Sequence, residues 1–194
     1  KESQARLILQ LSKVLEHRKE VPADSSSKMV QLCRLLGSKL KLRQDEIDLL
    51  EILSPLHDVG LLDIPLEVLN KPGPLSSEEW ELVRKHTEHG RKLFDSTEHD
   101  ILTAAARIAH EHHERYDGSG YPRGLIGSQT FLLGKVVGIA DTVLALSTTR
   151  SYRKAWSFDE VLGYLNEVKG KQFDPALVDI INDNAEAFRQ ILAS

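Results

Sequence analysis

The sequence has few cysteines, no excess of positive charge and no long hydrophobic run. A single cysteine, Cys33, excludes an intramolecular disulfide framework and fits a reducing compartment. The net charge of -4, with the histidines neutral, provides no overall field that would draw the chain to nucleic acid or to an anionic membrane. No apolar run approaches the roughly 20 residues that span a bilayer, and no signal peptide is visible. We therefore expect a cytoplasmic protein that neither inserts into a membrane nor binds nucleic acid.

The sequence also lacks a persuasive run of alternating β-branched residues, so it predicts an all-α fold without an internal repeat. Its 194 residues can bury a sizeable core, and its 41% hydrophobic and 28% charged residues are ordinary for a globular domain. Apolar spacing and capping signals predict a bundle of about eight helices. The expected helices include residues 4–19, 28–41, about 45–57, one from Ser76 to about Phe94, about 98–113, 131–148, one after Ser157, one after Asp174 and a C-terminal helix.

Two boundaries matter for the interpretation of the chain. Residues 1–20 are expected to form an N-terminal helix, which could be the end of a signalling linker, and residues 21–194 a single domain. Because the chain begins at Lys1 without a Met, it could be a piece of something longer. Within the domain, Gly60 is expected to end the third helix and residues 61–74, with three prolines, to form a loop.

Histidines and aspartates at the ends of predicted helices provide the chemistry. His112 and His113 are adjacent, end an alanine-rich apolar run, and precede a turn of sequence Gly-Ser-Gly-Tyr-Pro. Asp141 lies in another apolar run, where an unpaired carboxylate is costly to bury. The full set of candidate metal ligands is His57, Asp58, His86, His112, His113 and Asp141. Helices of a bundle can bring such residues together in its core.

Mixed histidine and aspartate ligands suit Fe, Mn, Zn or Ni better than Mg or Ca. An aspartate beside a histidine can bridge two metals, and water on such a site becomes a nucleophile near neutral pH, so phosphodiester hydrolysis is the natural chemistry. The alternative for a lone histidine such as His57 or His86 is a helix cap or a satisfied polar group. The remaining histidines, interpreted as solvent-facing or supporting, are His17, His89, His99 and His110.

From about residue 15 to 182 the sequence resembles the HD-GYP family, a subgroup of the HD phosphohydrolase superfamily. The motifs that carry the resemblance are His57-Asp58-Val59-Gly60, Ile64-Pro65, Lys71-Pro72-Gly73, His86, the block from His112 to Pro122 with Arg123-Gly124-Leu125, Ile139-Ala140-Asp141, Arg150-Ser151-Tyr152-Arg153-Lys154-Ala155-Trp156 and Phe173-Asp174-Pro175. The resemblance implies an all-α bundle with a two- or three-metal site. It implies hydrolysis of cyclic-di-GMP to linear pGpG or GMP, with related cyclic dinucleotides as further substrates.

By the same resemblance the six candidate ligands match metal ligands of the family. Gly120, Tyr121 and Pro122, together with Arg150 and Arg153, would match positions that hold the phosphates and bases of the dinucleotide. Taken alone, the two arginines would be interpreted as a solvated helix end. The family also suggests signalling proteins as partners through the Gly-Tyr-Pro loop and an upstream sensor or receiver domain. A homodimer is compatible with the sequence.

The chain departs from the family pattern at several polar positions. Leu61 stands where the family has a lysine that contacts the scissile phosphate, and Leu144 replaces a second acid. Alignment back from the His-Asp pair places Ser25 at a first-helix histidine and Val21 at a glutamate, although Glu20 could substitute if the register slips. Losing single electrostatic stabilisers commonly costs about 10²–10³-fold in rate. We therefore expect a phosphodiesterase scaffold whose activity is weak or lost.

One metal position keeps a complete set, Asp58 with three histidines, whereas a second keeps His57, Asp58 and Asp141 and is one ligand short. A third position looks absent. The expected cofactor is one or two divalent transition metal ions, Fe or Mn ahead of Zn or Ni. Two alternatives stay open: an active cyclic-di-GMP phosphodiesterase with a one- or two-metal site, and an HD hydrolase of another phosphate ester.

Overall fold

A computed structural model describes residues 22, 24–95, 100–149 and 154–193 of the chain. These residues form helices and no β-strand, with only two isolated bridges, Asp117 to Ile126 and Lys169 to Phe173. The prediction of an all-α bundle is confirmed. The helices are α2 (Ser25–Lys39), α3 (Gln44–Leu53), η1 (Ser54–Leu56), η2 (Val59–Asp63), α4 (Leu66–Leu69), α5 (Ser77–Arg84), α6 (His86–Leu93), α7 (Asp100–Glu111), η3 (Gly127–Gln129), α8 (Leu132–Leu146), α9 (Phe158–Glu167), α10 (Pro175–Asp183) and α11 (Ala185–Ala193), where η marks a 3₁₀ helix.

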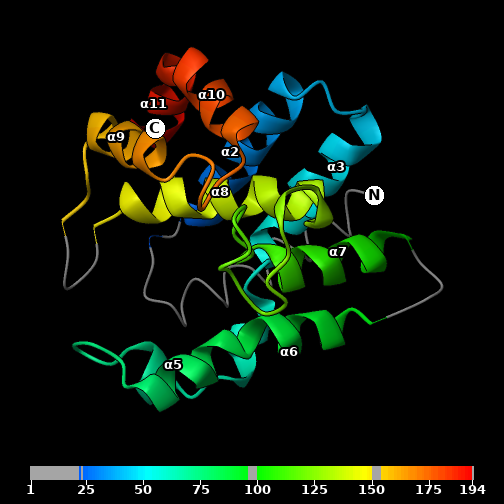
Figure 1. Cartoon of the computed structure of the whole chain (residues 1–194), viewed down its shortest axis with the longest axis vertical. Coiled ribbons are helices and arrows are strands. Elements are labelled where there is room, and N and C mark those ends of the chain that lie inside the picture. Colours follow the sequence, from blue (N-terminus) through cyan, green and yellow to red (C-terminus); the bar gives the residue numbers. More distant parts are fainter. Residues whose placement is uncertain (1–21, 23, 96–99, 150–153, 194) are drawn as a thin grey trace.

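Helix α8 runs through the middle of the bundle. On one side of it lie α9, α10 and α11, and on the other side lies α7, with α6 and α5 farther from α8 (Figure 1). Most of α8 is apolar and buried, including Val136, Val137, Ile139 and Val143, each at most 1% exposed. Burying such side chains is the main stabilising contribution to the fold. In consequence a polar side chain on α8, Asp141, projects from a rigid, closely packed element.

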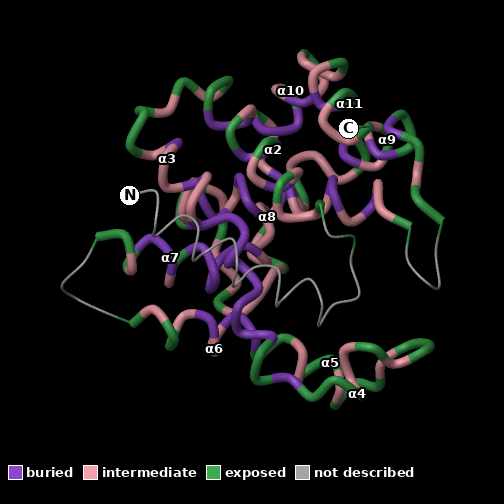
Figure 2. The backbone as a smooth tube through the Cα atoms, turned by 180° about the vertical axis from the view of Figure 1, so that it is seen from behind, coloured by how far each residue is buried: buried purple, intermediate pink, exposed green. Residues whose placement is uncertain are grey.

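The edge of the bundle is far less buried than its centre. Buried residues concentrate in α2, α7, α8 and the segment around η1 and η2, whereas α4 and α5 contain none (Figure 2). None of the described helices is long and apolar enough to cross a membrane. The expected N-terminal helix at residues 1–20 lies outside the described residues.

Capping residues in the sequence predicted the starts of several helices correctly. Ser76 and Ser157 each accept a hydrogen bond from the backbone N–H three residues later and form capping boxes, as predicted. Asp174 caps α10 by accepting from the N–H of Ala176, with Pro175 at the first helical position.

Three expected boundaries were wrong. The third helix ends at Leu53, because a separate 3₁₀ turn with Pro55 in its first turn follows it. Gly60 lies inside η2 instead of ending a helix, and the expected loop at residues 61–74 contains the end of η2 and the short α4.

The helix expected from Ser76 to about Phe94 is divided at Lys85 into α5 and α6. At the division, His86 Nδ1 contacts the Val83 carbonyl at 2.7 Å and Thr87 Oγ1 donates to the Arg84 carbonyl at 3.0 Å. Side chains therefore engage carbonyls that a continuous helix would pair with backbone N–H groups.

Candidate metal centre

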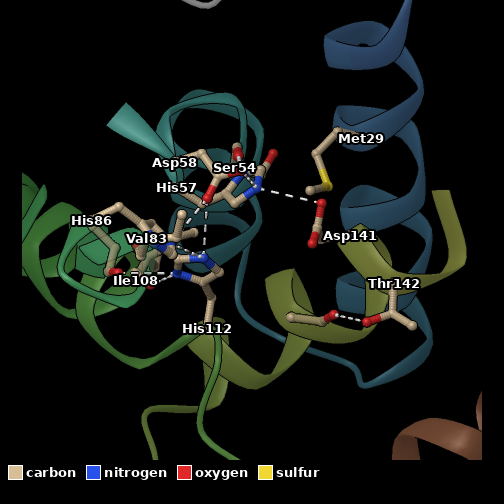
Figure 3. A network of polar contacts seen from close by, with 12 residues as sticks. Met29, Ser54, His57, Asp58, Val83, His86, Ile108, His112, Asp141 and Thr142 are labelled. Carbon is tan, nitrogen blue, oxygen red and sulfur yellow. Dashed lines mark hydrogen bonds and ion pairs between the residues drawn. The ribbon is translucent and has the colours of Figure 1, made fainter. Parts of the chain in front are cut away.

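The bundle brings all six candidate ligands together. His57 and Asp58 lie between η1 and η2, while His86 begins α6. His112 and His113 directly follow α7, and Asp141 projects from α8 toward His57 (Figure 3). Potential ligand atoms within 4.8 Å of one another form two groups: Asp58, His86, His112 and His113, and His57, Asp58 and Asp141. Asp58 is common to both.

The Asp58 carboxylate divides its two oxygens between the groups. Its Oδ1 lies 3.2 Å from His86 Nε2 and 3.3 Å from His112 Nε2. Its Oδ2 lies 3.2 Å from His57 Nε2, which is in turn 3.5 Å from Asp141 Oδ1. A carboxylate placed in this way can bridge two cations, one in each group.

Backbone carbonyls orient three of the imidazoles. His57 Nδ1 lies 2.7 Å from the Ser54 oxygen, and His86 Nδ1 lies 2.7 Å from the Val83 oxygen. His112 Nδ1 lies between the carbonyl oxygens of residues 108 and 109, at 3.1 and 3.0 Å. Because a carbonyl oxygen only accepts, each Nδ1 must carry the proton, and a neutral ring then presents the Nε2 lone pair to the cluster.

This donor arrangement fits a divalent metal. The Nε2 atoms of His86 and His112 face each other at 3.4 Å, so two lone pairs converge beside a carboxylate. His57 Nε2 is buried and faces carboxylate oxygens, those of Asp58 at 3.2 Å and Asp141 at 3.5 Å. Lone pairs that converge in a buried site are stabilised by a cation between them, and imidazole with carboxylate suits a transition metal.

The pKa values of the candidate ligand histidines are shifted in opposite directions. Burial lowers the pKa of His112 and lowers that of His113 further, so both rings favour the neutral form that binds metal. Burial also acts to lower the pKa of His57, but the carboxylates of Asp58 and Asp141 outweigh it and raise that pKa to about 10. The two carboxylates of the second group therefore favour a cation beside them, either a proton on His57 or a metal ion.

Two glycines allow the backbone to approach the ligand-bearing segments. A Cβ on Gly60 would lie 1.9 Å from the His86 carbonyl oxygen, and one on Gly138 would lie 2.3 Å from the His112 carbonyl oxygen. Neither side chain would fit, so η2 and α8 can contact these segments only through glycine. The sequence interpretation missed both roles. For Gly138 a signal was present, because a glycine within a helical pattern often has a packing reason.

A cavity of about 660 Å³ opens beside the first ligand group. Its wall includes His112, His113, Gly120 and Tyr121, and the Tyr121 ring stacks on His113 with centroids 4.8 Å apart. Of the expected substrate residues, the cavity wall thus contains Gly120 and Tyr121. It does not include Pro122, which follows them in the chain. Arg150 and Arg153 lie outside the described residues.

Two cavity residues on α5, Trp80 and Arg84, were not recognised as site residues from the sequence. His110 is buried instead of solvent-facing, and it contacts Glu88 of α6, which is not a candidate ligand, at 3.1 Å. His89 is partly buried and faces Asp63 at 3.6 Å. His17 and His99 lie outside the described residues.

The departures from the family pattern occupy two environments. Leu61 and Leu144 are buried, at 6% and 9% exposure, and neither lines the cavity. Ser25 is half-buried in the first turn of α2, but the α2 residue that points toward Asp141 is Met29 (Figure 3). Val21 and Glu20 lie outside the described residues.

Comparison with known proteins agrees with this geometry. A profile of the HD domain family matches residues 10–177. The cyclic di-GMP phosphodiesterase response regulator RpfG of Xanthomonas campestris is 35% identical over 98% of the chain, which covers 50% of that protein. The 3'3'-cGAMP-specific phosphodiesterase 2 of Vibrio cholerae is 34% identical over the whole chain, which covers 37% of that protein. The chain thus spans half or less of the length of these two relatives.

Two solved structures share the fold. A cyclic GMP-AMP specific phosphodiesterase of V. cholerae, V-cGAP3, superposes with a TM-score of 0.69 at 18% identity, covering 98% of this chain and 51% of that one. Bd1817, described as an HDG"Y"P protein from Bdellovibrio bacteriovorus, superposes with a TM-score of 0.63 at 26% identity, covering 84% of this chain and 52% of that one. With the paired ligand groups and the Gly-Tyr-Pro turn, these matches show that the chain belongs to the HD domain family, and within it to the HD-GYP type.

Proposed function

We propose that the chain is a metal-dependent phosphodiesterase domain that hydrolyses a cyclic dinucleotide, cyclic-di-GMP foremost, to a linear product. The observation that carries the proposal is the Asp58 carboxylate, which offers one oxygen to each of two ligand groups beside a cavity of nucleotide size. The names of the two curated relatives support this class of substrate.

The six ligands would hold one or two divalent transition metal ions, with Fe or Mn favoured over Zn or Ni. Such ions supply an activated water and stabilise negative charge on phosphoryl oxygens. The chain itself supplies orientation, because backbone carbonyls already hold three imidazoles with their Nε2 atoms inward. Little reorganisation is then needed when substrate binds.

Tyr121 connects the ligand group to the cavity. Its ring stacks on His113, and burial raises the pKa of its hydroxyl, so the group stays protonated over the physiological range. It can therefore donate a hydrogen bond to a phosphate oxygen. Among the described residues that line the cavity, Arg84 and Arg115 are accompanied by Glu81 and Glu114. The lining therefore carries no excess positive charge, and the two guanidinium groups can contribute directed N–H donors to phosphate oxygens.

We further propose that turnover is slow. The buried Leu61 and Leu144 provide no charge to the cavity, as expected from the departures from the family pattern. The alternative within this proposal is a silent domain that binds metal and nucleotide and acts through a partner protein. A buried apolar side chain can neither neutralise a phosphate nor protonate a leaving oxygen.

The test is to incubate the purified chain with Mn²⁺, or anaerobically with Fe²⁺, and cyclic-di-GMP or 3'3'-cGAMP, and to separate the products by chromatography. We expect slow formation of linear dinucleotide that is abolished by Asp58→Asn but retained by Asp183→Asn, a change on the exposed surface of α10. Binding without product would establish the silent alternative. If neither dinucleotide is bound or cleaved, the proposed function is wrong.

A gain-of-function variant tests the account of slow turnover. The triple variant Leu61→Lys, Leu144→Asp and Ser25→His restores the polar groups of the family pattern, and we expect it to raise turnover. Circular dichroism would verify that it folds, since two of the positions are buried. A folded variant with no gain in rate would show that these positions do not limit activity.

A further inference from the structure

Helix α5 presents a large aromatic side chain to the cavity without burying it in the core. Trp80 is 51% exposed and lines the cavity, and α5 contains no buried residue. The helix is held instead by its capping box and by the Lys71 to Glu79 ion pair. Packing therefore does not explain a tryptophan at this position, whereas an aromatic platform facing a nucleotide-sized cavity does.

Arg84 follows Trp80 by four residues, so one turn of α5 places both on the same face. Its guanidinium lies over the Tyr121 ring, 5.0 Å from the centroid, and Tyr121 stacks on His113. The planar groups of Arg84, Tyr121 and His113 are thus stacked one on the next, and this stack connects the cavity wall to the candidate metal ligands. Trp80, one turn earlier on α5, lines the same cavity.

The only ion pair of Arg84 among the described residues leaves it available to a ligand. It contacts Glu81 at 3.1 Å, but the two side chains are 47% and 68% exposed. Ion pairs at such exposure contribute little, because solvent screens them. A guanidinium stacked on an aromatic ring keeps its N–H donors in a plane that can form a fork to two adjacent acceptors, and within the described part of the chain only Nη1 of Arg84 is engaged, by the exposed Glu81.

We propose that Trp80 and Arg84 form a guanine-binding arm of the cavity. The Trp80 indole would stack on the purine ring, and Arg84 would donate to its O6 and N7 atoms. Guanine presents acceptors at both positions, whereas adenine presents an amino donor in place of O6, so the arm selects guanine. This inference rests on the proposed function, and both cyclic dinucleotides considered there contain guanine.

Because the chain has only two tryptophans, the fluorescence of Trp80 can be measured alone once the other is replaced. In a Trp156→Phe background Trp80 is the only tryptophan. Trp156 packs against Tyr164 and does not line the cavity, so the change leaves the proposed arm intact. The Mn²⁺-loaded protein would be mixed with cyclic-di-GMP or cyclic-di-AMP and its fluorescence read immediately, while equilibrium dialysis measures binding independently.

We expect cyclic-di-GMP to quench the Trp80 fluorescence and to bind at least tenfold more tightly than cyclic-di-AMP. Trp80→Ala should weaken cyclic-di-GMP binding about tenfold, in line with the effect of removing one base–aromatic stack, and Trp80→Phe should retain most of it. Arg84→Ala and Arg84→Lys should both abolish the preference for guanine, since lysine keeps the charge but not the fork. Arg43→Ala, at an exposed site remote from the cavity lining, is the matched control.

Different results of these experiments would refute the proposed guanine-binding arm and the proposed function. If dialysis detects binding but Trp80 fluorescence is unchanged and Trp80→Ala binds equally well, the arm is wrong and the function stands. If Arg84→Lys keeps the full preference for guanine, the assignment of base recognition to Arg84 is wrong. If neither dinucleotide binds the loaded protein, the arm and the proposed function fall together.

Discussion

Replacing Gly138 with alanine tests whether close backbone packing positions the metal ligands. The added Cβ would lie 2.3 Å from the His112 carbonyl oxygen, whereas such a C···O contact is normally about 3.3–3.6 Å. The backbones of α8 and the segment after α7 must therefore separate by about 1 Å. Metal–ligand distances in a working site vary by only about 0.2 Å, so a shift several times larger displaces His112 from its position.

We expect Gly138→Ala to lose metal affinity by at least about tenfold, the lower end of the effect of disturbing the support of a ligand. Overpacking should also destabilise the fold by about 1–3 kcal/mol, offset in part by about 1 kcal/mol from the helix propensity of alanine. Elemental analysis after dialysis against defined free Mn²⁺ measures the affinity, and thermal unfolding measures the stability.

The matched control is Gly163→Ala on α9, where an added Cβ meets no atom within 4 Å. It should leave metal content unchanged and raise the melting temperature by about 2–4 °C, the equivalent of about 1 kcal/mol in a chain of this length. If Gly138→Ala retains metal as well as Gly163→Ala does, glycine packing does not set the ligand geometry and the reasoning is refuted.

Three further predictions concern the metals and α5. Asp58→Asn should lose both ions because both groups share that carboxylate, whereas Asp141→Asn should lose only one, as counted by elemental analysis. Chelation should lower the melting temperature by about 5–10 °C, because an ion present at about 100 times its Kd stabilises by about 2.7 kcal/mol. The hydrogen bond from Lys71 lowers the pKa of Glu79 from 4.5, so its stabilising effect is complete above that value and is lost as the pH falls through the folded pKa. Glu79→Gln should remove this acid-dependent part of the melting temperature, and an unchanged profile would contradict the role of the ion pair.

The ligands could be predicted because their local sequence is informative. His112 and His113 are adjacent at the end of an apolar run, and Asp141 interrupts another such run. A polar residue at a position that packing would otherwise fill with a hydrophobic one needs a partner, and the structure places each beside other candidate ligands. Helix starts at Ser76 and Ser157 were equally local, because a capping box involves only four residues.

Features that depend on contacts between distant segments could not be predicted. The close approach of Gly60 to His86 joins residues 26 positions apart, and nothing near Gly60 in the sequence distinguishes it from a helix terminator. The break at Lys85 likewise depends on His86 bonding to a backbone carbonyl, a geometry that also orients the ring toward Asp58. Trp80 fits an apolar stripe in the sequence, and only its exposure beside the cavity distinguishes it from a core residue.

The candidate metal ligands and the proposed base-binding arm therefore lie on elements that differ in how deeply they are buried. His112 and Asp58 are buried against α8 and η2, where any movement costs packing energy across the core. Trp80 and Arg84 lie on α5, which buries none of its residues and is joined to the bundle largely through α6. Because α5 orients His86 through the backbone carbonyl of Val83, we expect side-chain substitutions at Trp80 and Arg84 to alter which base is bound while leaving that contact in place. This separation lets substrate preference change independently of the metal chemistry, and it is why the two can be tested by separate variants.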